Sequence, residues 1–245
     1  MNRFFVPPEN FHEEQVVIRG DDVKHISTVL RMKAGDKIHV LDGRGCLYDV
    51  QLAEIKRKEI VGHILSKQKY QTESPLKIRM GQALIKGNKI DHVVRKAVEL
   101  GVRSIACLRT ERCIARLKKE DEESRINRWQ KIAREASKQC GRSEAPVIDN
   151  AVRSLGQFCE GSRDCDLKFI FWENEKTARL KELKAPSKIS SIAFLAGPEG
   201  GFLPSEVELA KKYGFRPVTL GPRILKADSA SLVILSILQS LWGDL

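Results

Sequence analysis

The sequence predicts an α/β protein in which a small β-rich unit precedes a larger domain with a mostly parallel sheet. Short apolar runs separated by turn signals fill the first seventy residues, and strands then alternate with helical patterns from residue 76 onward. Near the C-terminus, two glycine-proline turns each follow an apolar run and lead into a helical pattern. These turns are Phe194–Phe202 and Leu220–Ala230.

The N-terminal unit is expected to be barrel-like, with strands at 16–18, 37–41, 46–55 and 60–66. Asp21 and Asp22 are expected to cap a helix over 21–30, whose apolar residues have helical spacing. The sequence Asp42–Gly45 predicts a hairpin turn. The polar stretch Gln71–Pro75 ends in proline and predicts a boundary between two domains, 1–72 and 73–245.

The C-terminal domain is expected to alternate strands and helices. Strands are predicted at 76–84, 104–108, 167–172, 190–196 and 217–220, and helices at 88–100, 121–140, 204–213 and 228–241. Parallel sheets of this kind bind ligands at the carboxyl ends of their strands. Since glycine lets a ligand approach the main chain closely, the two glycine turns predict a pocket built largely from backbone.

The turns also restrict what this pocket binds. Neither turn matches the Gly-x-Gly-x-x-Gly pattern of dinucleotide sites or the Gly-Lys-Ser/Thr ending of phosphate loops. Glu199 lies inside the first turn and would repel a phosphate. The ligand is therefore expected to be neutral or cationic at its reactive end. Taken alone, Gly197–Gly201 is equally well explained as a plain surface turn.

The composition, 42% hydrophobic and 31% charged over 245 residues, is typical of a globular protein. No apolar run approaches the roughly 20 residues that cross a bilayer, and the N-terminus does not resemble a signal peptide. The six cysteines form no Cys-x-x-Cys pair, so neither a disulfide framework nor a metal site is expected. These observations predict a cytoplasmic protein with unpaired thiols.

Positive charge is concentrated in one segment of the chain. The net charge is +11, and residues 77–119 alone carry 12 basic and 3 acidic side chains. A clustered excess of this kind indicates a face that binds a polyanion, for which nucleic acid is the first candidate. A merely solvated face is the alternative.

Six stretches, in order along the chain, resemble one known family. They are His25–Met32, Glu99–Val102, Thr110–Arg112, Glu135–Arg142, Gly197–Gly201 and Leu220–Leu225. On these residues the chain resembles the RsmE family, the 16S ribosomal RNA uracil-N3 methyltransferases of the SPOUT class. Because the stretches cover almost the whole chain in the family's order, the resemblance is more specific than any single motif.

The resemblance implies a PUA-like N-terminal β-barrel and a SPOUT-type α/β domain whose last part forms a trefoil knot. It implies a homodimer packed through the knot region and, as partner, 16S rRNA within the small ribosomal subunit, with no membrane and no metal. S-adenosylmethionine is implied as the methyl donor. The donor-binding residues implied on this chain are Trp172, Glu173, Leu195, Gly197, Glu199, Gly200, Gly201, Leu220, Gly221, Ile224, Leu225, Ser229 and Ala230.

The proposed chemistry needs a proton acceptor, because N3 of uracil carries a proton that must leave before its lone pair can attack. Asp228 is expected to take this proton, and Arg223 and Lys226 are expected to stabilise negative charge on the flanking carbonyl oxygens. The alternative role of Asp228 is the N-cap of the last helix, which is compatible with the first. Glu199 is expected to accept backbone hydrogen bonds within its own turn.

The chain departs from the family at one place. Leu225–Ala230 reads Leu-Lys-Ala-Asp-Ser-Ala where the family usually has Leu-Arg-Thr-Glu-Thr-Ala. Lysine cannot reproduce the bidentate fork of arginine, so the rate or the substrate geometry is open to change, whereas main-chain atoms still supply the donor site. Two alternatives remain: a knotted methyltransferase for another RNA nucleotide, and a non-catalytic RNA-binding protein on the same fold. Affinity for S-adenosylmethionine separates enzyme from binding module.

Contact with RNA is expected from basic side chains that act collectively. The candidates are Arg31, Lys86, Arg112, Arg134 and Arg142. Each of them taken alone is better explained as an ordinary surface residue than as an RNA contact.

Overall fold

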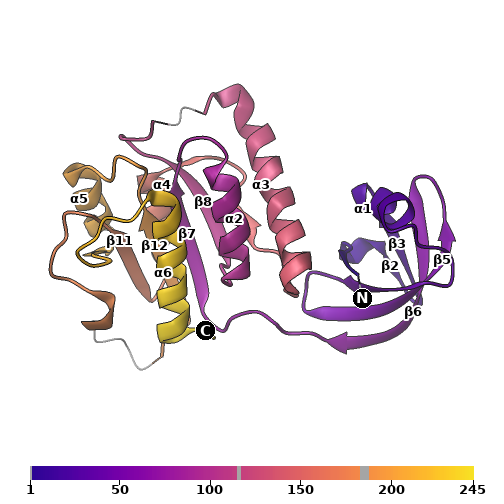
Figure 1. The fold of residues 1–245 in the computed structure, drawn as a ribbon. Helices are drawn as coiled ribbons and strands as arrows, with labels where there is room; N and C mark the ends of the chain where they lie inside the picture. The colour runs from indigo at the N-terminus through magenta and orange to yellow at the C-terminus, as the bar shows by residue number, and fades with distance from the viewer. Residues whose placement is uncertain (1, 115–116, 183–187) are drawn as a thin grey trace. The chain divides into compact units, whose positions relative to one another are not determined.

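The structure is a computed structural model that describes residues 2–114, 117–182 and 188–245 (Figure 1). Residues 115 and 116 of the basic segment lie outside the described residues. The contacts divide the chain into two compact units. The N-terminal unit comprises Met1–Glu73 and Ser137–Ala145, and the C-terminal unit comprises Ser74–Ala136 and Pro146–Leu245.

The N-terminal unit is built on one six-stranded sheet with the strand order β1-β4-β5-β6-β3-β2. β1 pairs with β4 in parallel, and the other neighbouring pairs are antiparallel. Alternate residues of each strand face the interior, so Ile18, Ile38 and Val50 are buried in one core. The strands are β1 (Arg3–Phe5), β2 (Phe11–His12), β3 (Gln15–Arg19), β4 (Lys37–Leu41), β5 (Cys46–Ile55) and β6 (Glu59–Lys69).

The predicted hairpin is confirmed, and the predicted helix is confirmed with a changed start. β4 and β5 pair antiparallel around Asp42, whose Oδ1 accepts the N–H of Arg44 at 2.8 Å. The helix consists of α1 (Asp21–Lys24) followed by a π-helical turn, His25–Val29. Its N-cap is Gly20, so the prediction that Asp21 and the next aspartate cap it is wrong. Both stand in the first turn, where the helix dipole favours acidic side chains.

The segment Ser137–Ala145 is held within the N-terminal unit by an ion pair. Glu73 accepts the backbone N–H of Glu144 at 3.1 Å and pairs with the guanidinium of Arg142, whose Nε lies 3.0 Å from its carboxylate. Arg142 is only 6% exposed, so its guanidinium charge is buried, and Glu73 neutralises it inside the unit. Burial of such a charge is tolerated only where hydrogen bonds and a counter-charge satisfy it.

This ion pair predicts a pH-dependent contribution to stability. Burial alone would raise the pKa of Glu73, but the Arg142 guanidinium and the Glu144 N–H hold it below its ordinary value of 4.5. A carboxylate whose pKa is lowered on folding stabilises the fold above its unfolded pKa and ceases to do so as the pH falls through the folded value. We expect Glu73→Gln to lower the free energy of unfolding by about 3 kcal/mol at neutral pH, and by much less below about pH 4.

Urea unfolding of the parent and of Glu73→Gln at both pH values checks this expectation. The same difference in stability at neutral and acidic pH would contradict it, because the effect would then not depend on the charge of Glu73.

The C-terminal unit contains a seven-stranded sheet in which every pair is parallel. Its order is β10-β8-β7-β12-β11-β13, and β9 also pairs with β8. The strands are β7 (Lys77–Ala83), β8 (Ser104–Arg109), β9 (Val147–Ile148), β10 (Arg153–Ser154), β11 (Leu167–Phe171), β12 (Ser191–Ala196) and β13 (Arg216–Val218). The helices are α2 (Lys89–Glu99), α3 (Lys119–Cys140), α4 (Leu155–Glu160), α5 (Pro204–Lys212) and α6 (Ala227–Trp242).

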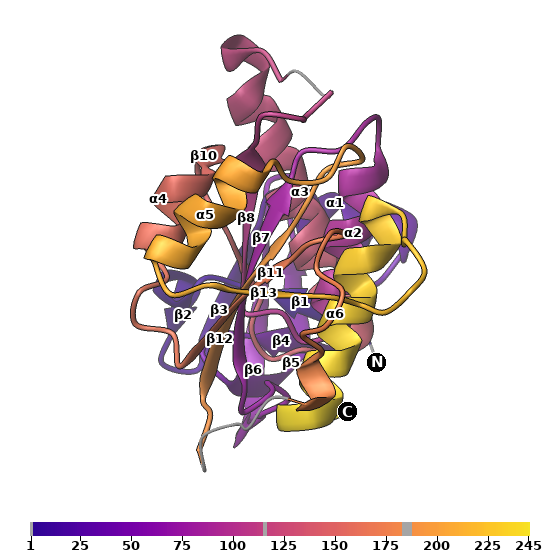
Figure 2. The same cartoon turned by 90° about the vertical axis from the view of Figure 1, so that its left-hand side faces the viewer.

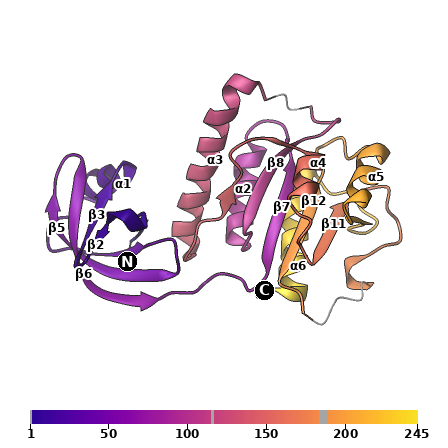
Figure 3. The same cartoon turned by 180° about the vertical axis from the view of Figure 1, so that it is seen from behind.

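Helices cover both faces of this sheet, as Figure 2 shows with α2 and α6 on one side and α4 and α5 on the other. The two faces have separate cores. Phe194 packs in the core under α2, α3 and α6, and its neighbour Leu195 packs in the core under α4 and α5. The view from behind (Figure 3) shows α4 beside the strands. The predicted parallel sheet covered by helices is thus confirmed, and α4 and the short strands β9 and β10 are additions to it.

Three general observations bear on function. None of the helices in the described residues is long and apolar enough to cross a membrane. Within the same ranges, no three His, Cys, Asp or Glu side chains come together as a metal site requires. The six cysteines are free, and burial raises the pKa of Cys159 to about 12 and also raises that of Cys107, which makes both thiols poor nucleophiles at neutral pH.

Candidate active site

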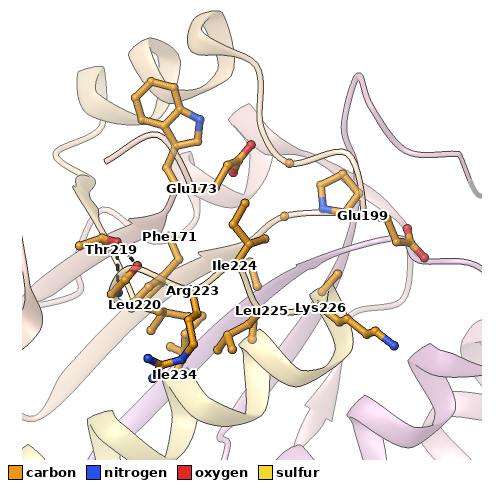
Figure 4. A pocket seen from close by; sticks show the side chains of 18 of the residues that line it. Phe171, Glu173, Glu199, Thr219, Leu220, Arg223, Ile224, Leu225, Lys226 and Ile234 are labelled. Carbon is orange, nitrogen blue, oxygen red and sulfur yellow. Dashed lines mark hydrogen bonds between the residues drawn. The ribbon is translucent and has the colours of Figure 1, made fainter. Parts of the chain in front are cut away.

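A cavity of about 590 Å³ lies at the carboxyl ends of β11, β12 and β13 (Figure 4). Its walls are formed by residues of the loops that follow these strands, within 171–176, 196–201 and 219–227, together with Ala230 and Ile234 of α6 and Lys89 of α2. Its volume falls within the range of about 300–1,000 Å³ that is typical of small-molecule sites. The two glycine turns therefore form parts of one cavity, as the sequence predicts.

Glycine is required at two points of the wall because the backbone has a positive φ there. Gly221 has φ +108°, and a Cβ built on it would meet nothing within 4 Å, so its open side belongs to the cavity. Gly201 has φ +68°, and a Cβ there would lie 1.9 Å from Oε1 of Glu173. The carboxylate of Glu173 thus occupies the space that a side chain at position 201 would need.

The loop after β11 is fixed by polar contacts at both ends. Trp172 Nε1 donates to the carbonyl of Phe202 at 3.2 Å, which links this loop to the end of the first glycine turn. Glu175 accepts the backbone N–H groups of Thr177 and Ala178, and these bonds lower its pKa to about 2. It therefore remains ionised and keeps the loop ordered across the physiological pH range.

The structure brings together most of the residues implied as donor-binding. Those that line the cavity are Trp172, Glu173, Gly197, Glu199, Gly200, Gly201, Leu220, Gly221, Ile224, Leu225 and Ala230. Leu195 does not, because it faces the core under α4 and α5 and is fully buried there. Ser229 does not line it either, and its side chain is exposed on the first turn of α6. The assignments of Leu195 and Ser229 to the wall are therefore corrected.

Of the three proposed catalytic residues, two line the cavity and one does not. Arg223 and Lys226 line the cavity and are exposed. Asp228 is not a lining residue, and its Oδ1 accepts the N–H of Ser229 at 2.9 Å. The N-cap of α6 is Lys226, so the prediction that Asp228 caps this helix is wrong. Asp228 lies instead in the first turn, where the helix dipole stabilises its negative charge.

Two carboxylates line the cavity, and their environments differ. Glu199 accepts the backbone N–H of Lys86 at 2.9 Å and lies 3.9 Å from Nζ of Lys89. Its bond therefore goes to the loop after β7, and the expectation of hydrogen bonds within its own turn is wrong. The carboxylate of Glu173 has no hydrogen-bond or ion-pair partner among the described residues, and Figure 4 shows it at the cavity. It is free to accept from a ligand.

The residues predicted to contact RNA also differ in exposure. Arg31, Lys86, Arg112 and Arg134 are exposed, whereas Arg142 is buried and paired with Glu73. The expectation that Arg142 contacts RNA is therefore corrected, because its guanidinium already has a partner in the interior.

Sequence patterns missed several residues of the wall. Lys89 and Lys176 line the cavity, and Nζ of Lys176 donates to the carbonyl of Glu173 at 2.8 Å. Thr219 lines it as well, and its Oγ1 accepts the N–H of Gly221 at 3.2 Å (Figure 4). A signal existed for Lys89, which belongs to the basic segment. Lys176 and Thr219 belong to no motif of the sequence.

Comparison with known families gives two matches. A family described as RNA methyltransferase domain matches residues 72–239, and one described as RNA methyltransferase PUA domain matches residues 18–65. These matches support the PUA-like character of the N-terminal unit.

Individual proteins agree with this. The chain is 34% identical over 231 residues to "Ribosomal RNA small subunit methyltransferase E" of Buchnera aphidicola subsp. Acyrthosiphon pisum, covering 94% of this chain and 90% of the relative. It is 29% identical to the protein of that name in Bacillus subtilis, covering 98% and 96%.

Solved structures are similar over their full length. The Neisseria gonorrhoeae protein of the same name, bound to S-adenosylmethionine, superposes with a TM-score of 0.88 at 31% identity, covering 100% of this chain and 99% of that one. A Legionella pneumophila protein in complex with bound S-adenosylmethionine superposes with a TM-score of 0.90 at 32% identity, covering 99% and 98%.

Proposed function

Because this chain belongs to the ribosomal RNA small subunit methyltransferase E family, we propose that it transfers a methyl group from S-adenosylmethionine to N3 of a uridine in the small-subunit ribosomal RNA. The expected acceptor is uridine 1498 in the conventional rRNA numbering. The observation that carries the proposal is the single cavity formed by three loops at the carboxyl ends of parallel strands.

The residues of the cavity suit this methyl donor. S-adenosylmethionine supplies an electrophilic methyl group on a positively charged sulfur, so the site need only hold and align it. The free carboxylate of Glu173 offers a negative charge, and Gly221 leaves space next to main-chain groups. Leu220, Ile224 and Leu225 add apolar surface to the wall. The negative charge of Glu173 would repel a polyphosphate at this part of the wall.

Basic side chains at the cavity suit an RNA substrate. Lys89, Lys176, Arg223 and Lys226 all line it. Cations placed there attract the phosphate backbone and can stabilise negative charge on a uracil that has lost its N3 proton. We propose Arg223 and Lys226 for that second role and Asp228 as acceptor of the proton.

Methylation assays on small ribosomal subunits and on naked 16S rRNA test the function. We expect transfer of one labelled methyl group, and base-level mapping is expected to find it at N3 of the proposed uridine. A methyl group on another nucleotide would support a knotted methyltransferase of different specificity. Absence of any affinity for S-adenosylmethionine would support the non-catalytic alternative.

We further propose that the C-terminal unit is knotted, acts as a homodimer and works in the cytoplasm, where ribosomal RNA is modified. In support of the knot, the backbone N–H of Thr219 donates to the carbonyl of Ala178 at 2.9 Å, so the segment entering the second glycine turn lies against the loop after β11.

The homodimer is supported by exposed apolar side chains on α6. Val233 and Leu241 are 37% and 42% exposed, which supports an apolar contact with a second copy. Light scattering of the whole chain is expected to give twice its mass of 27.7 kDa.

A further inference from the structure

We propose that Arg112 is a positioning residue for the donor site, and that it acts by holding the loop Gly197–Gly201 from its outer side. This inference rests on the proposed function, since it assumes that the loop binds S-adenosylmethionine. It differs from a role as an RNA contact, because it predicts an effect on the donor when no RNA is present.

The contact between Arg112 and the loop is direct and close. Nη1 of Arg112 donates to the carbonyl of Gly200 at 3.0 Å. A Cβ built on Gly200 would lie 3.1 Å from Cβ of Arg112 and 3.4 Å from its carbonyl oxygen. The turn that carries Arg112 therefore packs against the loop at a position where glycine permits the close approach.

The turn itself is fixed to the end of the same loop. Glu206 is only 8% exposed, and its Oε1 accepts the N–H of Glu111 at 3.0 Å. Its other oxygen accepts the N–H of Leu203 at 2.8 Å, at the start of α5. One buried carboxylate thus joins the neighbour of Arg112 to the residue that follows the glycine turn, which fixes the distance between the two segments.

A second contact holds the loop at Glu199, one residue before Gly200. Glu199 accepts the N–H of Lys86, so both contacts to the loop come from the basic segment, residues 77–119. The loop contains Gly197, Gly200 and Gly201, and glycine loses more conformational freedom on ordering than any other residue. Without the Arg112 contact, part of the binding free energy of the donor would be needed to order this loop.

The test compares Arg112→Ala with Arg95→Ala in the whole chain. Arg95 is exposed on α2, belongs to the same basic segment, and is not a cavity residue. Both variants remove one positive charge. Calorimetry without RNA is expected to show about tenfold weaker binding of S-adenosylmethionine by Arg112→Ala, and a change of less than about twofold for Arg95→Ala.

Two further measurements keep the outcome decisive. Arg112→Lys retains the charge and a hydrogen-bond donor but lacks the planar fork of arginine. Its donor affinity is expected to lie between those of the parent and Arg112→Ala, so it serves as the test variant if Arg112→Ala does not fold, and affinity equal to that of the parent would then count against the inference. Donor affinity that is unchanged in Arg112→Ala, or that falls equally in Arg95→Ala, would overturn the inference. Failure of rRNA methylation with an intact difference in donor binding would instead count against the proposed substrate.

Discussion

Gly221→Val is expected to weaken the binding of S-adenosylmethionine about a hundredfold. Gly221 lines the cavity, and a Cβ on it would meet nothing within 4 Å. The two methyl groups of valine would therefore enter the space proposed for the donor. Calorimetric titration of the whole chain with S-adenosylmethionine measures this change.

Gly35→Val is the matched control for this substitution. Gly35 has φ +96° and also has nothing within 4 Å, but it lies in the N-terminal unit and not at the cavity. Both variants carry the cost of a β-branched residue at positive φ, about 1–3 kcal/mol of stability. If donor affinity falls equally in both, backbone strain and not occupation of the cavity explains the loss.

Asp228→Asn is expected to lower the turnover number about a hundredfold while donor affinity changes little. The substitution preserves size and removes the negative charge that is proposed to accept the N3 proton. Asp228 lies two residues after Lys226, in the first turn of α6. Single-turnover methylation of small ribosomal subunits across a pH series measures the rate and its dependence on an ionised carboxylate.

Glu173→Gln is the comparison variant, because Glu173 is the carboxylate with no partner among the described residues that line the cavity. If Asp228→Asn keeps full turnover and Glu173→Gln loses it with donor affinity intact, the proton acceptor is Glu173. If Glu173→Gln instead weakens donor binding, the carboxylate serves the positively charged donor, as the sequence resemblance implies.

Much of the fold follows from local patterns in the sequence. The hairpin at Asp42 and the parallel strands β11 and β12 follow from turn chemistry and continuous apolar runs. No local pattern predicts strand β1, because it is three residues long and pairs with β4, which lies more than thirty residues away. The strands β9 and β10 have two residues each, and no periodicity can be detected over so short a length.

The site was only partly predictable for a related reason. Glycine turns can be recognised from the local sequence, but the role of a charged side chain depends on its neighbours in space. Arg112 and Arg142 look alike in the sequence, yet one faces the loop of Gly200 and the other is buried against Glu73. Glu73 and Arg142 are 69 residues apart, and no local pattern reports that pairing.

The pairing of Glu73 with Arg142 has a consequence for dissecting the protein. A fragment that stops at Glu73 would retain every strand of the six-stranded sheet but lack Ser137–Ala145, which the intact chain contributes to that unit. The side-chain carboxylate of Glu73 would then have no guanidinium to bind. An isolated N-terminal unit therefore needs residues 1–73 joined to the segment Ser137–Ala145. Simple C-terminal truncation at Glu73 would underestimate the stability of this unit.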